Sequence, residues 1–267
     1  SVLLKETISN LRLADNSTYL DLTLSSAGHA EAVGTLGLKG LTVIGIDADS
    51  NAIDRSARNL EGHTARIILE KGNYRTFPSI LDKHHIKHVN AIVIDLGLSS
   101  EQLDIARRGF SFRFDEPLIM TLNDSPTDQE LTAKIIVNEF SEESLSNIIF
   151  AYGEERFARR IARAIVEYRQ NKPIEFTSQL ADIVKRAIPM KFQSKKIHPA
   201  TKTFQAIRIA VNNELETIKE TILKTPLYLA SGGRLAIISF HSLEDRIVKQ
   251  TFRELADRGI GTVITTK

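Results

Sequence analysis

The chain has 267 residues, 42% of them hydrophobic, and a formal net charge of +2 at pH 7, which predicts a globular protein of one large or two unequal domains. The absence of cysteine excludes disulfides and thiolate metal sites, and the seven histidines lack the His-Glu-x-x-His spacing, so we expect no metal. No run of about 18 apolar residues occurs and the first residues do not resemble a signal peptide, so we expect a cytoplasmic protein without a membrane segment.

Apolar runs predict the strands of the fold. In chain order they lie at residues 18–24, 41–47, 67–70, 89–95 and 233–240. Helix-compatible stretches separate them, among them residues 31–38, 50–60 and 212–229. Because strands that alternate with helices form parallel sheets, the sequence predicts an α/β fold with a Rossmann-like, doubly wound sheet.

Helical periodicity interrupts this pattern in the middle of the chain. We therefore predict a discontinuous sheet domain of residues 1–104 and 199–267, with an all-helical inserted domain at residues 105–198. Residues 150–208 hold 13 Lys and Arg against 5 Asp and Glu, a surplus of eight, whereas the whole chain carries only +2. This concentration of positive charge favours an anionic partner.

One predicted helix, at residues 153–169, separates its arginines from its apolar residues. At about 100° per residue, one face carries Phe157, Ile161, Ala164, Ile165 and Tyr168, and another carries Arg156, Arg159, Arg160 and Arg163. The arginine face is either a solvated surface or a nucleic-acid contact, since the guanidinium fork suits phosphate. Lys195 and Lys196, in a short basic loop, complete this candidate RNA-binding set.

Polar residues follow the early strands. Asp21 precedes a turn of small residues ending at Gly28, whose backbone amides a ligand could approach closely. Asp47 lies 26 residues later, near the spacing of about 20 at which a carboxylate binds a cofactor ribose, and Tyr74 is a candidate cover for an adenine ring. A ligand-free turn, a helix cap and a core tyrosine are the ordinary alternatives.

Asp95 emerges at the carboxyl end of a buried strand, where open α/β sheets bind their ligands, although a capping role would account for it equally well. Ser99 and Ser100 follow it closely. Phe110, Phe112 and Phe114 alternate further along, so one edge of that segment could receive an aromatic base, with core packing as the commoner alternative.

Several motifs, in this order, resemble those of a known family. They are Gly28-His29, Asp47-Ala-Asp49, Asp95-Leu-Gly-Leu-Ser-Ser, Arg108-Gly-Phe-Ser-Phe112, Tyr152-Gly-Glu-Glu-Arg156, His198-Pro-Ala-Thr-Lys-Thr-Phe-Gln-Ala-Ile-Arg208, Val211-Asn-Asn-Glu-Leu215 and Ser239-Phe-His-Ser-Leu-Glu-Asp-Arg246. On these residues the chain resembles the ribosomal RNA small-subunit methyltransferase H family, whose members use S-adenosylmethionine to methylate N4 of a cytidine in the decoding region of 16S rRNA.

The resemblance implies both a cofactor site and a substrate domain. The cofactor contacts it implies are Ala27, Gly28, His29, Asp47, Tyr74, Asp95 and Gln102. The helical insertion would recognise the substrate, which is small-subunit rRNA or an assembling small ribosomal subunit. The family's Gly-x-Gly-Gly-His is Ser25-Ser26-Ala27-Gly28-His29 here, and a left-handed backbone at a replaced glycine would cost about 1–2 kcal/mol.

The chemistry of cytosine suggests catalytic candidates. Its N4 amine is a poor nucleophile, so orientation should dominate, and Asp95 with Ser99 and Ser100 is placed to accept the amine hydrogens. His241 is a candidate for late proton acceptor or base-binding group, with a structural role at the strand end as its alternative.

Three other functions compete with this one. The main alternative is a non-catalytic rRNA-binding or ribosome-assembly factor with a degenerate cofactor site, suggested by the lost glycines. A methyltransferase for protein or small molecules fits the basic insertion less well. A nicotinamide dehydrogenase is disfavoured because the Gly-x-Gly-x-x-Gly fingerprint is absent.

Overall fold

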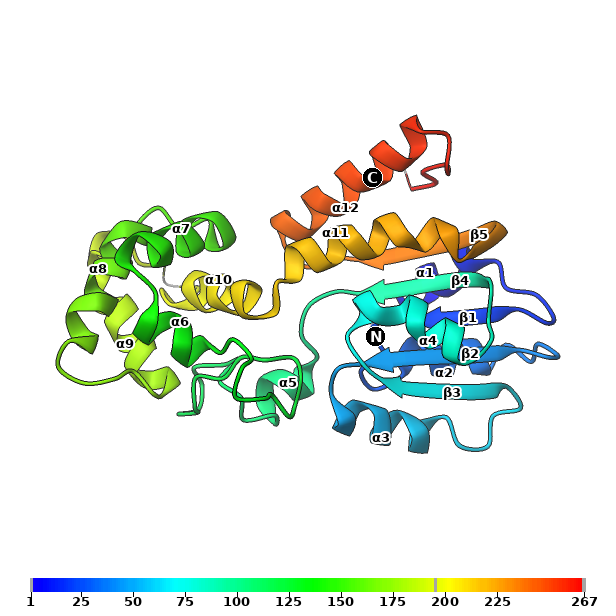
Figure 1. Cartoon of the computed structure of the whole chain (residues 1–267), viewed down its shortest axis with the longest axis horizontal. Coiled ribbons are helices and arrows are strands. Elements are labelled where there is room, and N and C mark those ends of the chain that lie inside the picture. The colour runs from blue at the N-terminus through cyan, green and yellow to red at the C-terminus, as the bar shows by residue number, and fades with distance from the viewer. Residues whose placement is uncertain (1, 195, 266–267) are drawn as a thin grey trace. The chain divides into compact units, whose positions relative to one another are not determined.

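The computed structural model describes residues 2–194 and 196–265 and divides into two compact units (Figure 1). The sheet unit comprises Ser1–Gly97 with Leu215–Lys267, and the helical unit comprises Leu98–Glu214. Within the described ranges, every helix is too short or too polar to span a lipid bilayer.

A five-stranded parallel sheet forms the centre of the sheet unit. Its strands are β1 (Thr18–Asp21), β2 (Thr42–Asp47), β3 (Arg66–Lys71), β4 (Val89–Asp95) and β5 (Leu229–Ile238). They lie in the order β3-β2-β1-β4-β5, and every pairing is parallel. The predicted doubly wound sheet is confirmed, including the return of the chain to it as β5 after the insertion.

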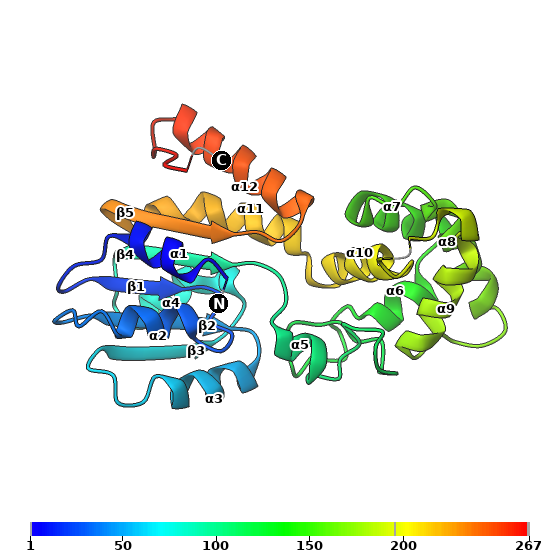
Figure 2. The same cartoon turned by 180° about the vertical axis from the view of Figure 1, so that it is seen from behind.

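Helices cover both faces of this sheet, as Figures 1 and 2 show. One face packs against α1 (Leu4–Leu11), α2 (Gly28–Gly34) and α3 (Ser50–Asn59). The other packs against α4 (Phe77–Lys83), α11 (Glu214–Lys224) and α12 (Ser242–Asp257), while η1 (Tyr74–Thr76) and η3 (Thr225–Leu227) are short turns. Side chains alternate along the buried strands, so that Tyr19 faces the first core and Leu20 the second.

The helical unit has a core of its own. Its elements are α5 (Ser100–Asp104), α6 (Ala133–Glu139), α7 (Glu142–Gly153), α8 (Ala158–Arg169), α9 (Thr177–Ala187), η2 (Met190–Phe192) and α10 (Thr201–Asn212). Fully buried residues such as Ile136, Ile149, Ile161 and Leu180 join these helices in one apolar cluster. We predicted the insertion at residues 105–198; the compact unit is wider at both ends, since it also includes α5, which we had placed in the sheet domain, and α10, which packs against α7. Gly153 permits this close packing, since a Cβ there would lie 2.7 Å from the carbonyl oxygen of Lys202.

The single helix predicted over residues 153–169 is wrong at its beginning. Helix α7 ends at Gly153, and Glu154 adopts a left-handed backbone with φ of 48°. The Glu155 carboxylate then accepts a hydrogen bond from the backbone N of Phe157 at 2.9 Å, and α8 begins at Ala158. Arg156 therefore lies before the helix. Of the predicted apolar face, Ile161 and Ile165 are buried, whereas Ala164 and Tyr168 are half-buried.

Candidate functional site

Three aspartates lie at the carboxyl ends of neighbouring strands, and we call them the acidic edge: Asp21 on β1, Asp47 on β2 and Asp95 on β4. Asp21 is paired with Gly45 of β2 and Val93 of β4, so the other two carboxylates lie two residues further along on either side of it. The sequence predicted each of these strand ends. The structure brings them together on one edge of the sheet.

Two members of the acidic edge are held by hydrogen bonds from backbone and side-chain donors. The Asp21 carboxylate accepts from the Tyr19 hydroxyl at 3.0 Å and from the backbone N of Thr23 at 3.1 Å. The Asp47 carboxylate accepts from the backbone N of Ser25 at 2.8 Å and of Asp49 at 2.9 Å. Both side chains are therefore fixed before any ligand arrives.

Burial and mutual repulsion make the acidic edge reluctant to ionise. Burial raises the pKa of Asp21 from 3.8 to about 7, and the negative charges of Asp95 and Asp47 add to this effect. Burial also raises the pKa of Asp47. A positively charged ligand would relieve this repulsion, whereas an anionic one would increase it.

Asp95 offers an unused acceptor at this edge. Its backbone N donates to the Thr23 hydroxyl at 2.6 Å, which fixes the strand end. Its Oδ1 atom is buried and, among the residues that the structure describes, has no hydrogen-bond partner. Burial raises the pKa of Asp95 to about 6, and the charge of Glu244 adds to the increase. A ligand that donates a hydrogen bond would satisfy this oxygen.

His29 lies beside Asp95 without forming a strong ion pair. Its Nδ1 atom is 3.8 Å from the Asp95 carboxylate, and its ring is almost fully buried. Burial lowers the pKa of His29, so the ring is neutral near pH 7. It therefore leaves the charge of Asp95 uncompensated.

The turn between β1 and α2 is strained at both of the positions where glycine is replaced. Ser25 has φ of 51° and Ala27 has φ of 64°, in the left-handed region that side chains disfavour. Helix α3 holds the turn in place: Ser56 donates its hydroxyl to the Ser25 carbonyl at 3.1 Å, and Asn59 donates its amide to the Ser26 carbonyl at 3.0 Å. The turn therefore keeps the left-handed backbone that favours glycine, although Ser25 and Ala27 occupy those positions.

Tyr74 lies just beyond the carboxyl end of β3, next to the strand that ends in Asp47. Its ring is half-buried and packs against the core that contains Phe77 and Ile80. This location is compatible with the predicted role as a cover for an adenine ring, which stays a prediction.

Two residues at and just after the β5–α12 connection, Phe240 in the connection and Glu244 in the first turn of α12, were not among the predicted site residues. Glu244 is buried and accepts a hydrogen bond from the backbone N of Phe240 at 2.9 Å. The Phe240 side chain is 55% exposed and packs beside Gly97, where an added Cβ would lie 3.4 Å from the ring. An aromatic residue two positions beyond the end of β5, the strand that pairs with the one carrying Asp95, was the available signal.

His241 has a structural role at the beginning of α12. Its Nδ1 accepts from the backbone N of Glu244 at 3.4 Å, and its Nε2 lies 3.2 Å from the Glu244 carboxylate. This geometry favours the tautomer with its proton on Nε2. Within the described residues Nε2 has no hydrogen-bond partner despite this distance, so the bond at Nδ1 is the one that orients the ring.

Ser99, Ser100 and Gln102 belong to the helical unit rather than to the acidic edge. Ser99 and Gln102 bond each other: the Gln102 side chain accepts from the backbone N of Ser99 at 3.0 Å, and the Ser99 hydroxyl accepts from the backbone N of Gln102 at 3.1 Å. This is a capping box for α5. Ser100 begins α5, and its side chain lies outside the described part of the structure.

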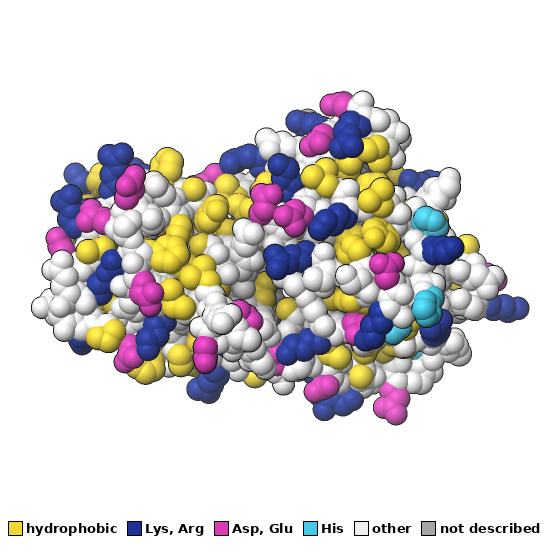
Figure 3. All heavy atoms as spheres, viewed as in Figure 1, with side chains coloured by type: hydrophobic (Ala, Val, Ile, Leu, Met, Phe, Trp, Pro, Cys, Tyr) yellow, Lys and Arg dark blue, Asp and Glu magenta, His cyan; other side chains and the backbone are white. Residues whose placement is uncertain are grey.

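The predicted RNA-binding residues lie on the surface of the helical unit, where Figure 3 shows Lys and Arg interspersed with hydrophobic side chains. Arg159, Arg160 and Arg163 are exposed on α8, and Lys196 is exposed after η2. Arg156 packs over Phe157 at 4.8 Å and over Phe192 at 4.3 Å. Lys195 lies outside the described residues.

The phenylalanines predicted to meet a base have other partners. Phe110 is buried in the helical core, and Phe112 packs against His198 with ring centroids 4.5 Å apart. Phe114 is 49% exposed. Core packing, the commoner alternative, accounts for the first two.

One family and several of its named members match this chain over nearly its whole length. A model of the MraW methylase family matches residues 1–264. The protein named Ribosomal RNA small subunit methyltransferase H from Halothermothrix orenii is 48% identical over 256 residues, which cover 96% of this chain and 81% of that protein. Proteins of the same name from Fusobacterium nucleatum and Fervidobacterium nodosum are also 48% identical, covering 96% and 94% of this chain and 79% and 84% of their own lengths.

Restoring glycine at position 25 should stabilise the protein. Ser25→Gly releases about 1–2 kcal/mol of left-handed strain and costs about 0.4–1 kcal/mol of added unfolded-state entropy, so we expect a net gain of about 0.5–1 kcal/mol in urea unfolding. Ser26→Gly, at a position without positive φ, is the matched control and should lose stability. Equal effects at the two positions would contradict the strain assignment.

The protonation of Asp21 predicts a pH-dependent stability. Between an unfolded pKa of 3.8 and a folded pKa of about 7, the folded state retains a proton that the unfolded state has released. The contribution of Asp21 to the free energy of unfolding therefore falls as pH rises through this window, by up to about 1.4 kcal/mol per pH unit. Asp21→Asn does not titrate, so its stability relative to wild type should increase from pH 5 to pH 8 in urea unfolding. Parallel pH profiles would rule out a raised pKa at Asp21.

Proposed function

The chain belongs to the MraW methylase family, and from that premise we propose that it transfers the methyl group of S-adenosylmethionine to N4 of a cytidine in the decoding region of 16S rRNA. The family resemblance predicted from the sequence is confirmed. Such a substrate fits the expected cytoplasmic location. The identity of the methyl donor and of the methylated atom goes beyond the family assignment and is proposed.

The negative charge of the acidic edge is the observation that favours S-adenosylmethionine as the methyl donor. Asp21, Asp47 and Asp95 repel one another at the ends of adjacent strands, and the raised pKa of Asp21 reflects this in part. S-adenosylmethionine carries a sulfonium and an ammonium group, so it would lower the electrostatic energy of the edge. The pyrophosphate of a dinucleotide would raise that energy, which argues against a nicotinamide enzyme.

The residues around the edge fit the other parts of this donor. Asp47 lies at the carboxyl end of β2, where a carboxylate accepts hydrogen bonds from ribose hydroxyls, and each of its oxygens has a further lone pair beyond the bond it already accepts. The turn at Ala27 and Gly28 and the ring of Tyr74 complete the proposed cofactor set with His29. Gln102 stays in the set as a prediction, although its side chain is occupied by Ser99. When bound, the donor supplies an electrophilic methyl group.

Asp95 is proposed to orient the target amine. Its buried Oδ1 would accept a hydrogen from N4, which localises the nitrogen lone pair toward the methyl carbon. Alignment of nitrogen, carbon and sulfur can supply about 7–11 kcal/mol of the barrier. As the N–C bond forms and the S–C bond breaks, N4 becomes acidic, and a carboxylate with a pKa of about 6 can accept the released proton.

Phe240 is proposed as the surface that receives the cytosine ring. Its ring is exposed beside Gly97, two residues after Asp95, and its backbone is fixed by Glu244. Stacking on an aromatic side chain stabilises an unstacked base by about 1–3 kcal/mol. Ser99 and Ser100 remain candidates for further contacts to the amine, and His241 for a late proton acceptor.

One observation favours the alternative of a non-catalytic rRNA-binding or assembly factor. Ser25 and Ala27 hold left-handed conformations, and strain in this turn is the feature expected of a degenerate cofactor site. The hydrogen bonds from Ser56 and Asn59 oppose that interpretation, because they preserve the shape of the turn.

Two variants should separate donor binding from base binding. We expect Asp47→Ala to weaken S-adenosylmethionine binding by at least tenfold in calorimetric titration, because the ribose would lose its acceptor. Phe240→Leu should leave that affinity unchanged and raise the KM for small-subunit rRNA, since only the stacking surface is removed. The product is measured as N4-methylcytidine by mass spectrometry of digested rRNA.

Phe240→Tyr is the control, because it keeps the aromatic face and should restore the KM. If wild-type protein binds no S-adenosylmethionine, the non-catalytic alternative replaces the proposed function. If it binds the donor but methylates another atom or another class of substrate, the donor assignment stands and the cytidine assignment falls.

A further inference from the structure

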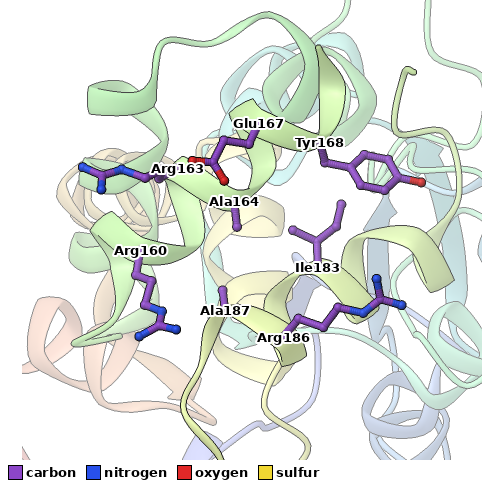
Figure 4. Close-up of a pocket in the computed structure, with 8 residues that line it drawn as sticks. All are labelled: Arg160, Arg163, Ala164, Glu167, Tyr168, Ile183, Arg186 and Ala187. Atoms are coloured by element: carbon purple, nitrogen blue, oxygen red, sulfur yellow. The ribbon is translucent and has the colours of Figure 1, made fainter. Parts of the chain in front are cut away.

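An open groove lies in the helical unit between α8 and α9, and none of its lining residues belongs to the acidic edge. Its volume is about 680 Å³, within the range of pockets that hold nucleotide-sized ligands. Figure 4 shows three arginines around it, Arg160 and Arg163 from α8 and Arg186 from α9, with the small apolar side chains Ala164, Ile183 and Ala187 between them. The groove therefore combines a cationic rim with an apolar floor.

The rim has more positive charge than its surroundings neutralise. Arg160 and Arg186 are exposed and, within the described part of the chain, have no carboxylate within ion-pair distance. Arg163 lies 3.6 Å from Glu142, and Glu167 is the single acid among the lining residues that the structure describes. The guanidinium groups of Arg160 and Arg186 come from different helices, line the same hollow and point to different sides of it in Figure 4, so they would contact different phosphates of a bound polyanion.

Aromatic rings also lie on α8 and next to the ends of α8 and α9. Tyr168 lines the groove. Beyond the other end of α8, Arg156 lies 4.3 Å from the ring of Phe192, which follows α9 and is 45% exposed. The Phe157 and Phe192 ring centroids are 5.3 Å apart. Alternating cations and exposed rings are the composition of surfaces that bind single-stranded nucleic acid.

We propose that this groove binds an unpaired stretch of RNA, with Arg160 and Arg186 contacting its phosphates and one base lying on the apolar floor beside Tyr168. The proposal rests on the proposed function, in which RNA is the substrate, and adds a second contact separate from the methyl-transfer residues. A duplex is a poorer fit because its bases are stacked inside and could not enter the hollow. An acidic peptide would contact the arginines of the rim but has no base to lie on the apolar floor.

The test is the affinity of a fluorescein-labelled, single-stranded 12-nucleotide RNA, measured by anisotropy at several salt concentrations. The double variant Arg160→Gln/Arg186→Gln should bind it roughly tenfold more weakly. The slope of log affinity against log salt should fall by about 1.4, since each lost phosphate contact removes about 0.7 for a single strand. Arg253→Gln, an exposed arginine of α12 in the sheet unit, is the control for loss of charge and should change neither quantity.

An unchanged salt slope in the double variant would overturn the proposal. So would equal affinity for the same RNA in duplex form, or displacement of the RNA by a poly-glutamate peptide as effective as unlabelled RNA. Arg160→Lys/Arg186→Lys keeps the charge and should recover most of the binding, which separates loss of charge from misfolding. Weaker RNA binding by the double variant, in a protein whose wild type forms no N4-methylcytidine, would support the groove while refuting the proposed reaction.

Discussion

The burial of Asp21, Asp47 and Asp95 at one edge of the sheet, together with the repulsion of Asp21 by the other two carboxylates, is the constraint on which the proposed site depends. The parallel order of β2, β1 and β4 brings three carboxylates to one edge, where Asp21 is fully buried and Asp47 and Asp95 are partly buried, so water screens their charges less than at an open surface. The fold tolerates this because Tyr19, Thr23 and the turn at Ser25 donate hydrogen bonds to two of them. The remaining excess of negative charge is what makes a cationic methyl donor a suitable ligand.

The strained turn and the acidic edge are parts of one arrangement. Ser25 takes a left-handed backbone and, from that position, donates its backbone N to Asp47. A relaxed turn would direct that donor elsewhere and leave the Asp47 carboxylate with one bond fewer. Strain of about 1–2 kcal/mol at Ser25 is therefore offset by a hydrogen bond to a charged group, which contributes about 1.5–3 kcal/mol.

The sequence predicted the strands and the aspartates at their ends because apolar runs bounded by polar residues mark buried parallel strands directly. It did not predict the break after Gly153, because that glycine is the last helical residue of α7 and the left-handed backbone falls on Glu154, a residue type that does not mark a helix end. Phe240 was missed for a different reason: its importance depends on Gly97, which is distant in sequence. The Ser99–Gln102 capping box has the Ser-x-x-Gln spacing, but this spacing does not distinguish a capping serine from one that contacts a substrate.

The pKa values of Asp21 and Asp95, measured by carbon-detected NMR titration with and without S-adenosylmethionine, test the central claim most directly. Both should fall when the donor binds, because its positive charge favours ionised carboxylates, and S-adenosylhomocysteine, which lacks the sulfonium charge, should lower them less. Saturating donor that leaves both pKa values unchanged would contradict the account.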